Sequence, residues 1–147
     1  MTITRVFDAP CNMVYKAWTE TDQLAIWWGP KGFTNPVCEI DLRPGGEILI
    51  HMQAPDGTIY PMSGMFKEIV EDKLIVFTSA ALDVNSQPLF EVMNVVTFTA
   101  EGNKTKLTLH ATVSNIRPEA APYLAGMNEG WNMSLDRLNE LVIALNK

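Results

Sequence analysis

The sequence is poor in cysteine, histidine and basic residues, and it contains no long apolar run. Its two cysteines, Cys11 and Cys38, lack a CxxC spacing and form no disulfide framework, and two reduced thiols are favoured over a single bridge. The 11 lysine and arginine residues are scattered singly in a chain of net charge -6. Because nucleic acids and anionic membranes bind clustered basic residues, the composition disfavours both as partners.

The chain also lacks the marks of a membrane or exported protein. No apolar run approaches the ~20 residues needed to cross a bilayer. The first ten residues have no basic segment followed by an apolar core, so they do not resemble a signal peptide. With 47% hydrophobic and 19% charged residues, the 147-residue chain is expected to be one cytoplasmic globular domain over residues 1–147.

The first part of the chain predicts a strand and two short helices. Residues 2–8 are rich in Thr, Ile, Val and Phe, which is typical of a strand. Pro10 suits the start of a helix, where its missing N–H costs nothing. Thr21 is a suitable N-cap for a second short helix, which Gly29 would end.

From residue 33 to residue 114 the apolar residues follow a period of two, which indicates strands. Turn-forming residues interrupt this region at Pro44-Gly45-Gly46, at Pro55-Asp56-Gly57 and at residues 101–104. Strands joined by tight turns are usually neighbours, so the region predicts an antiparallel meander of about six strands. Residues 2–8 would add a seventh.

The last part, residues 118–146, predicts a long helix. About 25 helical residues span roughly 38 Å, and a sheet must curve along such a helix to cover its apolar face. The sequence therefore predicts an α+β fold with a curved antiparallel sheet of about seven strands around the C-terminal helix. The residues of the predicted buried face, spaced by three and four, are Leu124, Met127, Trp131, Leu135, Leu138, Val142 and Leu145.

Six segments of the chain occur together in a characteristic order, at residues 6–10, 27–30, 41–46, 60–64, 105–109 and 130–138. In order and spacing they resemble the stand-alone relatives of the heat-shock protein ATPase activator, within the START-like (SRPBCC), birch-allergen-like superfamily. The resemblance covers nearly the whole chain and implies a helix-grip fold, in agreement with the periodicity. It also implies that the chain can form a homodimer. The true chaperone activators resemble the chain through one of their two domains, so a chaperone is a less favoured partner.

Strand parity places both histidines on the outer face of the sheet. In residues 47–52 the apolar Ile48, Ile50 and Met52 alternate with His51, and His110 likewise alternates with inward apolar residues. Without an inward histidine, a histidine base and a His-ligated metal site lose support. The sequence also contains no GxGxxG, P-loop or GxSxG motif, so we expect neither a metal nor a cofactor.

The remaining candidates would line a cavity between the sheet and the long helix. Methionine fills irregular space and repacks easily, which suits an adaptable apolar site as well as an ordinary core. Met65 and Met93 have outward parity and are left out. The predicted ligand-binding residues are Trp28, Phe33, Ile50, Met52, Tyr60, Met62, Phe66, Phe77, Asn94, Met127, Gly130, Trp131 and Ser134.

Two glycines in the predicted long helix require an explanation. Gly126 and Gly130 stand one turn apart, and each costs roughly 0.8–1.0 kcal/mol relative to alanine inside a helix. Either space for a bound molecule or close approach of another element would explain them.

Binding of a small hydrophobic or aromatic molecule is the leading functional interpretation. An enzyme of cyclase or hydrolase type in the same cavity is an alternative, with Asn94, Tyr60, Glu39 and Ser134 as the candidate polar groups and no catalytic residue assigned. A chaperone-accessory or stress-response interaction role is a further alternative. Asp41 and Arg43 are expected to form a structural pair at a hairpin.

Overall fold

The computed structural model describes residues 1–146, and its elements follow the predicted order. Seven strands form one antiparallel sheet in the order β1-β7-β6-β5-β4-β3-β2, which confirms the predicted α+β helix-grip fold. The elements are β1 (Thr2–Phe7), α1 (Cys11–Thr19), α2 (Thr21–Trp27), β2 (Thr34–Ile40), β3 (Glu47–Gln53), β4 (Ile59–Val70), β5 (Leu74–Ala81), β6 (Glu91–Glu101), β7 (Lys104–Ser114), the 3₁₀ turn η1 (Pro118–Ala120) and α3 (Ala121–Leu145).

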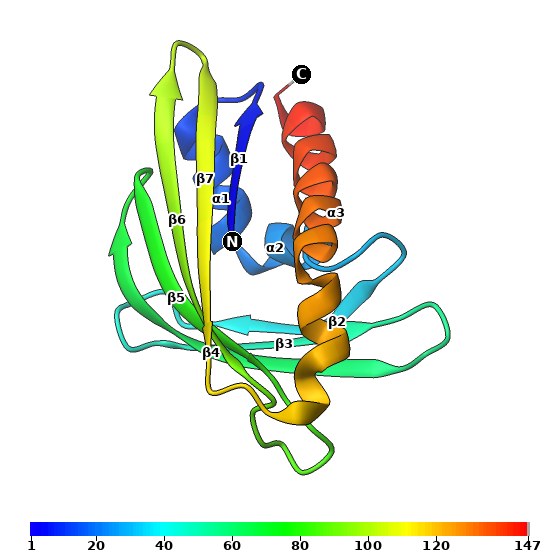
Figure 1. Ribbon diagram of the computed structural model, residues 1–147. Helices are drawn as coiled ribbons and strands as arrows, with labels where there is room; N and C mark the ends of the chain where they lie inside the picture. The colour runs from blue at the N-terminus through cyan, green and yellow to red at the C-terminus, as the bar shows by residue number, and fades with distance from the viewer. Residues whose placement is uncertain (147) are drawn as a thin grey trace.

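The sheet is strongly curved. Figure 1 shows β2, β3 and β4 running across the direction of β6 and β7, with α3 along the open side. In β4, a Cβ atom on Gly64 would lie 2.0 Å from the carbonyl oxygen of Thr78, so only glycine permits this approach to β5. The β4–β5 register shifts just beyond, between Phe66 and Glu68, and such bulges bend a strand.

The core occupies one end of the concave face. There α1 and α2 pack against the C-terminal half of α3, and Leu135, Leu138 and Val142 have no exposed surface. Arg5 of β1 holds the middle of α3 through an ion pair with Asp136, with 2.8 Å between Nη1 and Oδ1. The hydrophobic contacts thus fix the half of α3 that follows residue 133.

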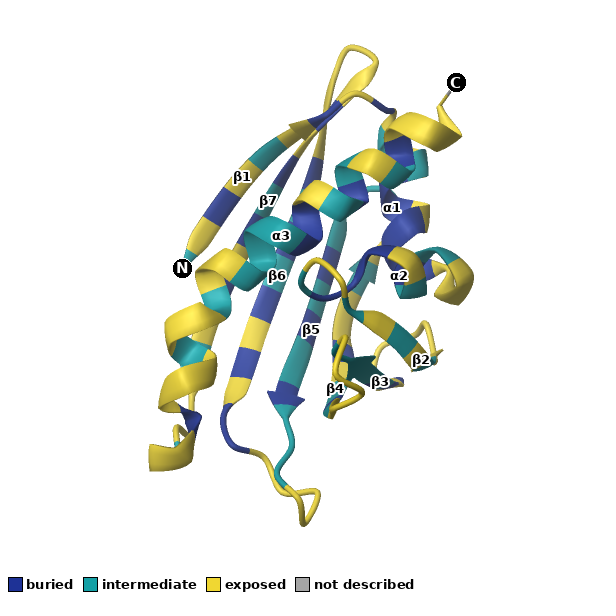
Figure 2. Cartoon of the chain, turned by 90° about the vertical axis from the view of Figure 1, so that its right-hand side faces the viewer, coloured by how far each residue is buried: buried dark blue, intermediate teal, exposed yellow. Residues whose placement is uncertain are grey.

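The N-terminal half of α3 lies outside this core. The buried residues of the helix are Ser134, Leu135, Leu138 and Val142, and Figure 2 shows the preceding turns as half-buried or exposed. The prediction of one continuous buried face was therefore wrong: Leu124, Met127 and Trp131 are half-buried, and Leu145 in the last turn is 45% exposed. The physical reason is that the curved sheet leaves a space beneath the first turns of the helix.

Two local predictions were also wrong. Thr21 is the first residue of α2 rather than its cap: Glu20 occupies the N-cap position, and its carboxylate accepts a hydrogen bond from the side chain of Gln23 at 3.0 Å. The alternation that predicts Cys38 and Ile40 on the inner face of the sheet also predicts Leu42 there, but Leu42 is 42% exposed because β2 ends at Ile40.

The hairpin between β2 and β3 contains the predicted ion pair. The pair between Asp41 and Arg43 is confirmed, with 2.7 Å between Oδ2 and Nε. Within residues 1–146, none of the helices has the length and apolar character to span a membrane.

Candidate functional site

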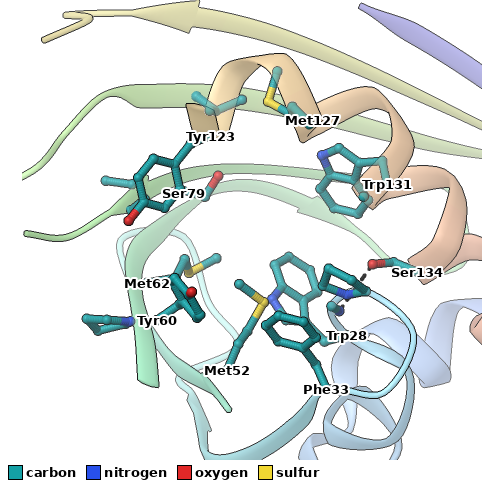
Figure 3. A pocket seen from close by; sticks show the side chains of 18 of the residues that line it. Trp28, Phe33, Met52, Tyr60, Met62, Ser79, Tyr123, Met127, Trp131 and Ser134 are labelled. Carbon is teal, nitrogen blue, oxygen red and sulfur yellow. Dashed lines mark hydrogen bonds between the residues drawn. The ribbon is translucent and has the colours of Figure 1, made fainter. Parts of the chain in front are cut away.

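The space beneath the N-terminal half of α3 is a pocket with a volume of about 340 Å³. Its walls are the loop after α2, the inner face of β3 to β6, the β5–β6 loop and α3 (Figure 3). Nearly all of the walls are apolar. The lining residues are Trp28, Gly29, Pro30, Phe33, Met52, Tyr60, Pro61, Met62, Ser79, Ala80, Ala81, Leu82, Phe90, Val92, Pro122, Tyr123, Gly126, Met127, Gly130, Trp131 and Ser134.

Most of the residues selected from the sequence meet at this pocket. They come from four separate regions of the chain, and Figure 3 shows the side chains of all but the glycine among them converging on one space. The selected residues in the lining are Trp28, Phe33, Met52, Tyr60, Met62, Met127, Gly130, Trp131 and Ser134.

The other four selected residues lie deeper in the protein. Ile50, Phe66 and Phe77 line a second cavity of about 20 Å³, which shares Trp28 and Met62 with the pocket. Asn94 is fully buried, and its amide nitrogen donates to the carbonyl oxygen of Phe77 at 3.3 Å and to Ser79 Oγ at 2.9 Å. Strand parity identified the inner face for all four, but it does not tell which end of the concave face a residue occupies.

Several lining residues were missed in the sequence reasoning, although signals for them existed. Phe90 and Val92 share the strand parity of Asn94, and Ser79 shares that of Phe77. Tyr123 precedes Met127 by one helical turn, so the same face of α3 carries it to the pocket. Following the strand alternation for one more inward position, or the helix face for one more turn, would have identified these residues.

The two helix glycines face the pocket. A Cβ atom on Gly126 or Gly130 would meet no heavy atom outside the local helix backbone within 4 Å. Close approach of another element therefore does not explain these glycines. They widen the space between α3 and the sheet at the cost of helix propensity.

The loop that follows α2 forms one wall and is fixed by α3. Gly29 has φ +96°, which favours glycine, and a Cβ there would lie 3.0 Å from Met52 Sδ. Its backbone N–H donates to Ser134 Oγ at 3.1 Å. The Asn35 amide adds hydrogen bonds to the carbonyl oxygens of Ala25 at 2.9 Å and Trp28 at 2.8 Å.

Arg137 completes this attachment, and the sequence reasoning did not identify it. Its Nη1 donates to the carbonyl oxygens of Trp28, Gly29 and Pro30 at 3.1, 2.9 and 3.0 Å, and its Nη2 donates to that of Ile26 at 2.5 Å. Burial lowers the pKa of the guanidinium below its usual range. A cation at the C-terminal end of α2 also satisfies carbonyl groups that the helix leaves free.

Aromatic rings surround both ends of the pocket. At the closed end, Trp131 is stacked on Trp18 with centroids 6.0 Å apart and meets Trp28 edge to face at 5.3 Å. At the mouth, the rings of Tyr60 and Tyr123 meet edge to face at 6.5 Å. Rings at both ends favour a flat, apolar ligand.

The chemical groups at the pocket suit binding better than acid–base catalysis. Its lining contains no histidine, carboxylate, amine, guanidinium or thiol among the described residues, and Glu39 is exposed elsewhere. Cys11 and Cys38 are free, and burial raises the pKa of the Cys38 thiol to about 11, which keeps it protonated at neutral pH. Within residues 1–146, no group of three or more metal-ligating side chains is present.

A curved sheet that grips a long helix over an apolar pocket defines a START-like helix-grip domain. The chain belongs to the family described as Activator of Hsp90 ATPase homolog 1-like protein, whose model matches residues 8–142. No curated protein matches the sequence significantly.

Solved structures of bacterial proteins share the fold over nearly the full length. A protein from Nitrosomonas europaea is 30% identical with a TM-score of 0.83, covering 99% of this chain and 95% of that one. One from Mycobacterium smegmatis is 29% identical with a TM-score of 0.81, covering 96% and 88%. One from Chromobacterium violaceum is 27% identical with a TM-score of 0.80, covering 97% and 96%.

Proposed function

We propose that the protein binds a small hydrophobic or aromatic molecule in the pocket between the sheet and the N-terminal half of α3. The observation that carries the proposal is an open, apolar space of about 340 Å³ under helix turns that carry glycine instead of packing side chains. Small-molecule sites in proteins have volumes of ≈ 300–1,000 Å³ and mostly apolar walls with few polar groups.

The arrangement of contacts supports a preformed site. The C-terminal half of α3 is fixed in the core, and Ser134 and Arg137 fix the Trp28–Pro30 wall against it. A wall held in this way loses little freedom when a ligand enters, and this raises affinity.

Binding is favoured over a cyclase or hydrolase reaction by the same geometry. General acid–base catalysis requires a titratable group within hydrogen-bond reach of the substrate, with a pKa near the working pH. Among the described residues, the ionisable side chains of the lining are the phenols of Tyr60 and Tyr123, and the lining contains no carboxylate, imidazole, amine or thiol.

The proposal is tested by titration with the neutral fluorescent probe N-phenyl-1-naphthylamine. We expect one-to-one binding to the wild type and at least about tenfold weaker binding to the Gly130→Leu variant, whose new side chain occupies the pocket. Asn128→Leu is the matched control, because Asn128 is exposed on the same helix and does not line the pocket. Equal affinity for all three proteins, or no binding by the wild type, would contradict the proposal.

Binding is also expected to raise the melting temperature. A ligand at 100 times its Kd stabilises the native state by about 2.7 kcal/mol. For a chain of this size that corresponds to about 5–10 °C. The Gly130→Leu variant should show a much smaller shift at the same probe concentration.

A further inference from the structure

Among residues 1–146, four polar groups at the pocket are hydrogen-bond donors without a protein partner. They are the indole N–H groups of Trp28 and Trp131 and the hydroxyls of Tyr60 and Tyr123. In the described part of the chain no side-chain hydrogen bond uses these four atoms, whereas the neighbouring Trp27 donates to a backbone carbonyl at 2.8 Å. An indole nitrogen donates and does not accept, so the partner it lacks is an acceptor.

The two serine oxygens at the pocket already accept hydrogen bonds within the protein. Ser79 Oγ accepts from the amide of Asn94 at 2.9 Å, and Ser134 Oγ accepts from the backbone N–H of Gly29 at 3.1 Å. The phenol oxygens of Tyr60 and Tyr123 can accept as well as donate, whereas the two indole N–H groups can only donate, so these two groups are left for an acceptor on the ligand. Such a site favours a ligand that carries an acceptor such as a carbonyl or ether oxygen.

The pocket offers no opposite charge to an ionised ligand. Its lining contains no Lys, Arg, His, Asp or Glu among the described residues. Arg137 lies next to the pocket wall, but its guanidinium binds four backbone carbonyl oxygens and does not line the pocket. A carboxylate or an ammonium group would lose hydration there without gaining an opposite charge.

The size and the walls limit the shape of the ligand. An apolar cavity of about 150 Å³ accepts benzene, and this pocket has about 340 Å³. The edge-to-face pairs Trp28–Trp131 and Tyr60–Tyr123 stand at its two ends, with interplanar angles of 81° and 74°. Rings of this kind pack well against the faces and edges of a flat molecule.

From these observations we infer that the ligand is an uncharged molecule of two or three fused rings that carries a hydrogen-bond acceptor. This inference rests on the proposed function, and it narrows the ligand from any hydrophobic molecule to one chemical class. It excludes fatty acids, aromatic acids and amines as the preferred ligands.

The test compares four naphthalenes that share one ring system. The dissociation constants of 2-acetylnaphthalene, 2-isopropylnaphthalene, 2-naphthoate and 2-naphthylmethylammonium are measured by calorimetry at pH 7. We expect both charged compounds to bind at least about tenfold more weakly than the ketone. A charged compound that binds as tightly as the ketone would overturn the inference.

The role of the free donors is tested by the affinity ratio of the ketone to the hydrocarbon. This ratio should fall about five- to tenfold in at least one of three variants that lose a donor but keep a ring, and it should stay unchanged in Met127→Leu. The three variants are Trp28→Phe, Trp131→Phe and the double variant Tyr60→Phe/Tyr123→Phe. Because each ratio is taken within one protein, a general loss of affinity does not alter it.

The outcomes separate the inference from the proposed function. If the hydrocarbon binds and the ratio is the same in every variant, the inference fails and the proposed function stands. If none of the four compounds binds the wild type, the proposed function fails as well. If the ratio falls and both charged compounds bind weakly, the result supports the inference as well as the proposed function.

Discussion

Replacing both helix glycines by alanine is expected to make the protein more stable. The double variant Gly126→Ala/Gly130→Ala gains roughly 0.8–1.0 kcal/mol of helix propensity at each position. No steric penalty opposes this gain, because a Cβ at either position meets no heavy atom beyond the local helix backbone within 4 Å. The free energy of unfolding should therefore rise by about 1.6–2.0 kcal/mol, provided that the two effects add.

The assay is reversible unfolding in urea, followed by circular dichroism, together with a thermal scan. For a domain of this size the melting temperature should rise by about 3–8 °C. Gly57→Ala is the matched control: its Cβ would also meet open space, but its φ of +91° disfavours a side chain. We expect that control to lose about 1–2 kcal/mol.

The result that would refute the reasoning is a double variant less stable than the wild type. Such a loss would mean that another element packs against the glycine face of α3, and that the pocket is closed in solution. A gain in stability with the control destabilised would show that the glycines are retained for the space and not for the fold.

Two other changes have distinct expected results. Arg137→Met keeps the length of the side chain but leaves four carbonyl oxygens without their donor. We therefore expect the free energy of unfolding in urea to fall by about 2–3 kcal/mol and probe binding to weaken, with smaller effects in Arg137→Lys. An unchanged unfolding midpoint in Arg137→Met would contradict this role of the arginine. The hydrogen bond from the Arg117 side chain, together with those from the Gln87 and Asn85 backbone N–H groups, holds the pKa of Asp83 below its ordinary value of 3.8. The ionised Asp83 carboxylate therefore stabilises the fold above pH 3.8, and this stabilisation is lost as the pH falls through the lowered pKa. Urea midpoints between pH 6 and pH 2.5 should therefore fall less steeply in Asp83→Asn than in the wild type, and identical slopes would contradict the assignment.

The periodicity of the sequence was sufficient for the fold because burial in this protein follows simple patterns. Alternation in the strands placed Ile50 and Asn94 inside and Met65 and Met93 outside, and the structure agrees, with the two methionines 37% and 39% exposed. Spacing by three and four identified α3. These patterns report which face of an element is apolar.

The same patterns could not give the limits of the core. Leu135 and Trp131 have the same helical spacing, yet Leu135 is fully buried and Trp131 lines a pocket, because the sheet curves away between them. Phe77 shares the parity of the lining residue Ser79 but lies deeper. Which end of a curved face a residue occupies depends on the bend, and the close contact at Gly64 that permits the bend has no periodic signal.

Arg137 shows a second reason why the sequence could not predict the whole site. Its partners are the backbone carbonyl oxygens of Ile26 in the last turn of α2 and of residues 28–30 in the loop that follows, and such groups are present in every sequence. A sequence pattern therefore cannot indicate that an arginine over 100 residues away will bind them. Contacts of this kind become visible only when the elements are placed in space.

The most direct test of the central claim uses the methionine methyl groups in a ¹³C-methyl NMR titration with N-phenyl-1-naphthylamine. Met52, Met62 and Met127 line the pocket, whereas Met65 and Met93 lie on the outer face of the sheet. If the ligand enters the space under α3, the first three signals shift together and saturate at one equivalent while the other two stay in place. Shifts confined to Met65 and Met93, or no shift at all, would show that this space holds no ligand.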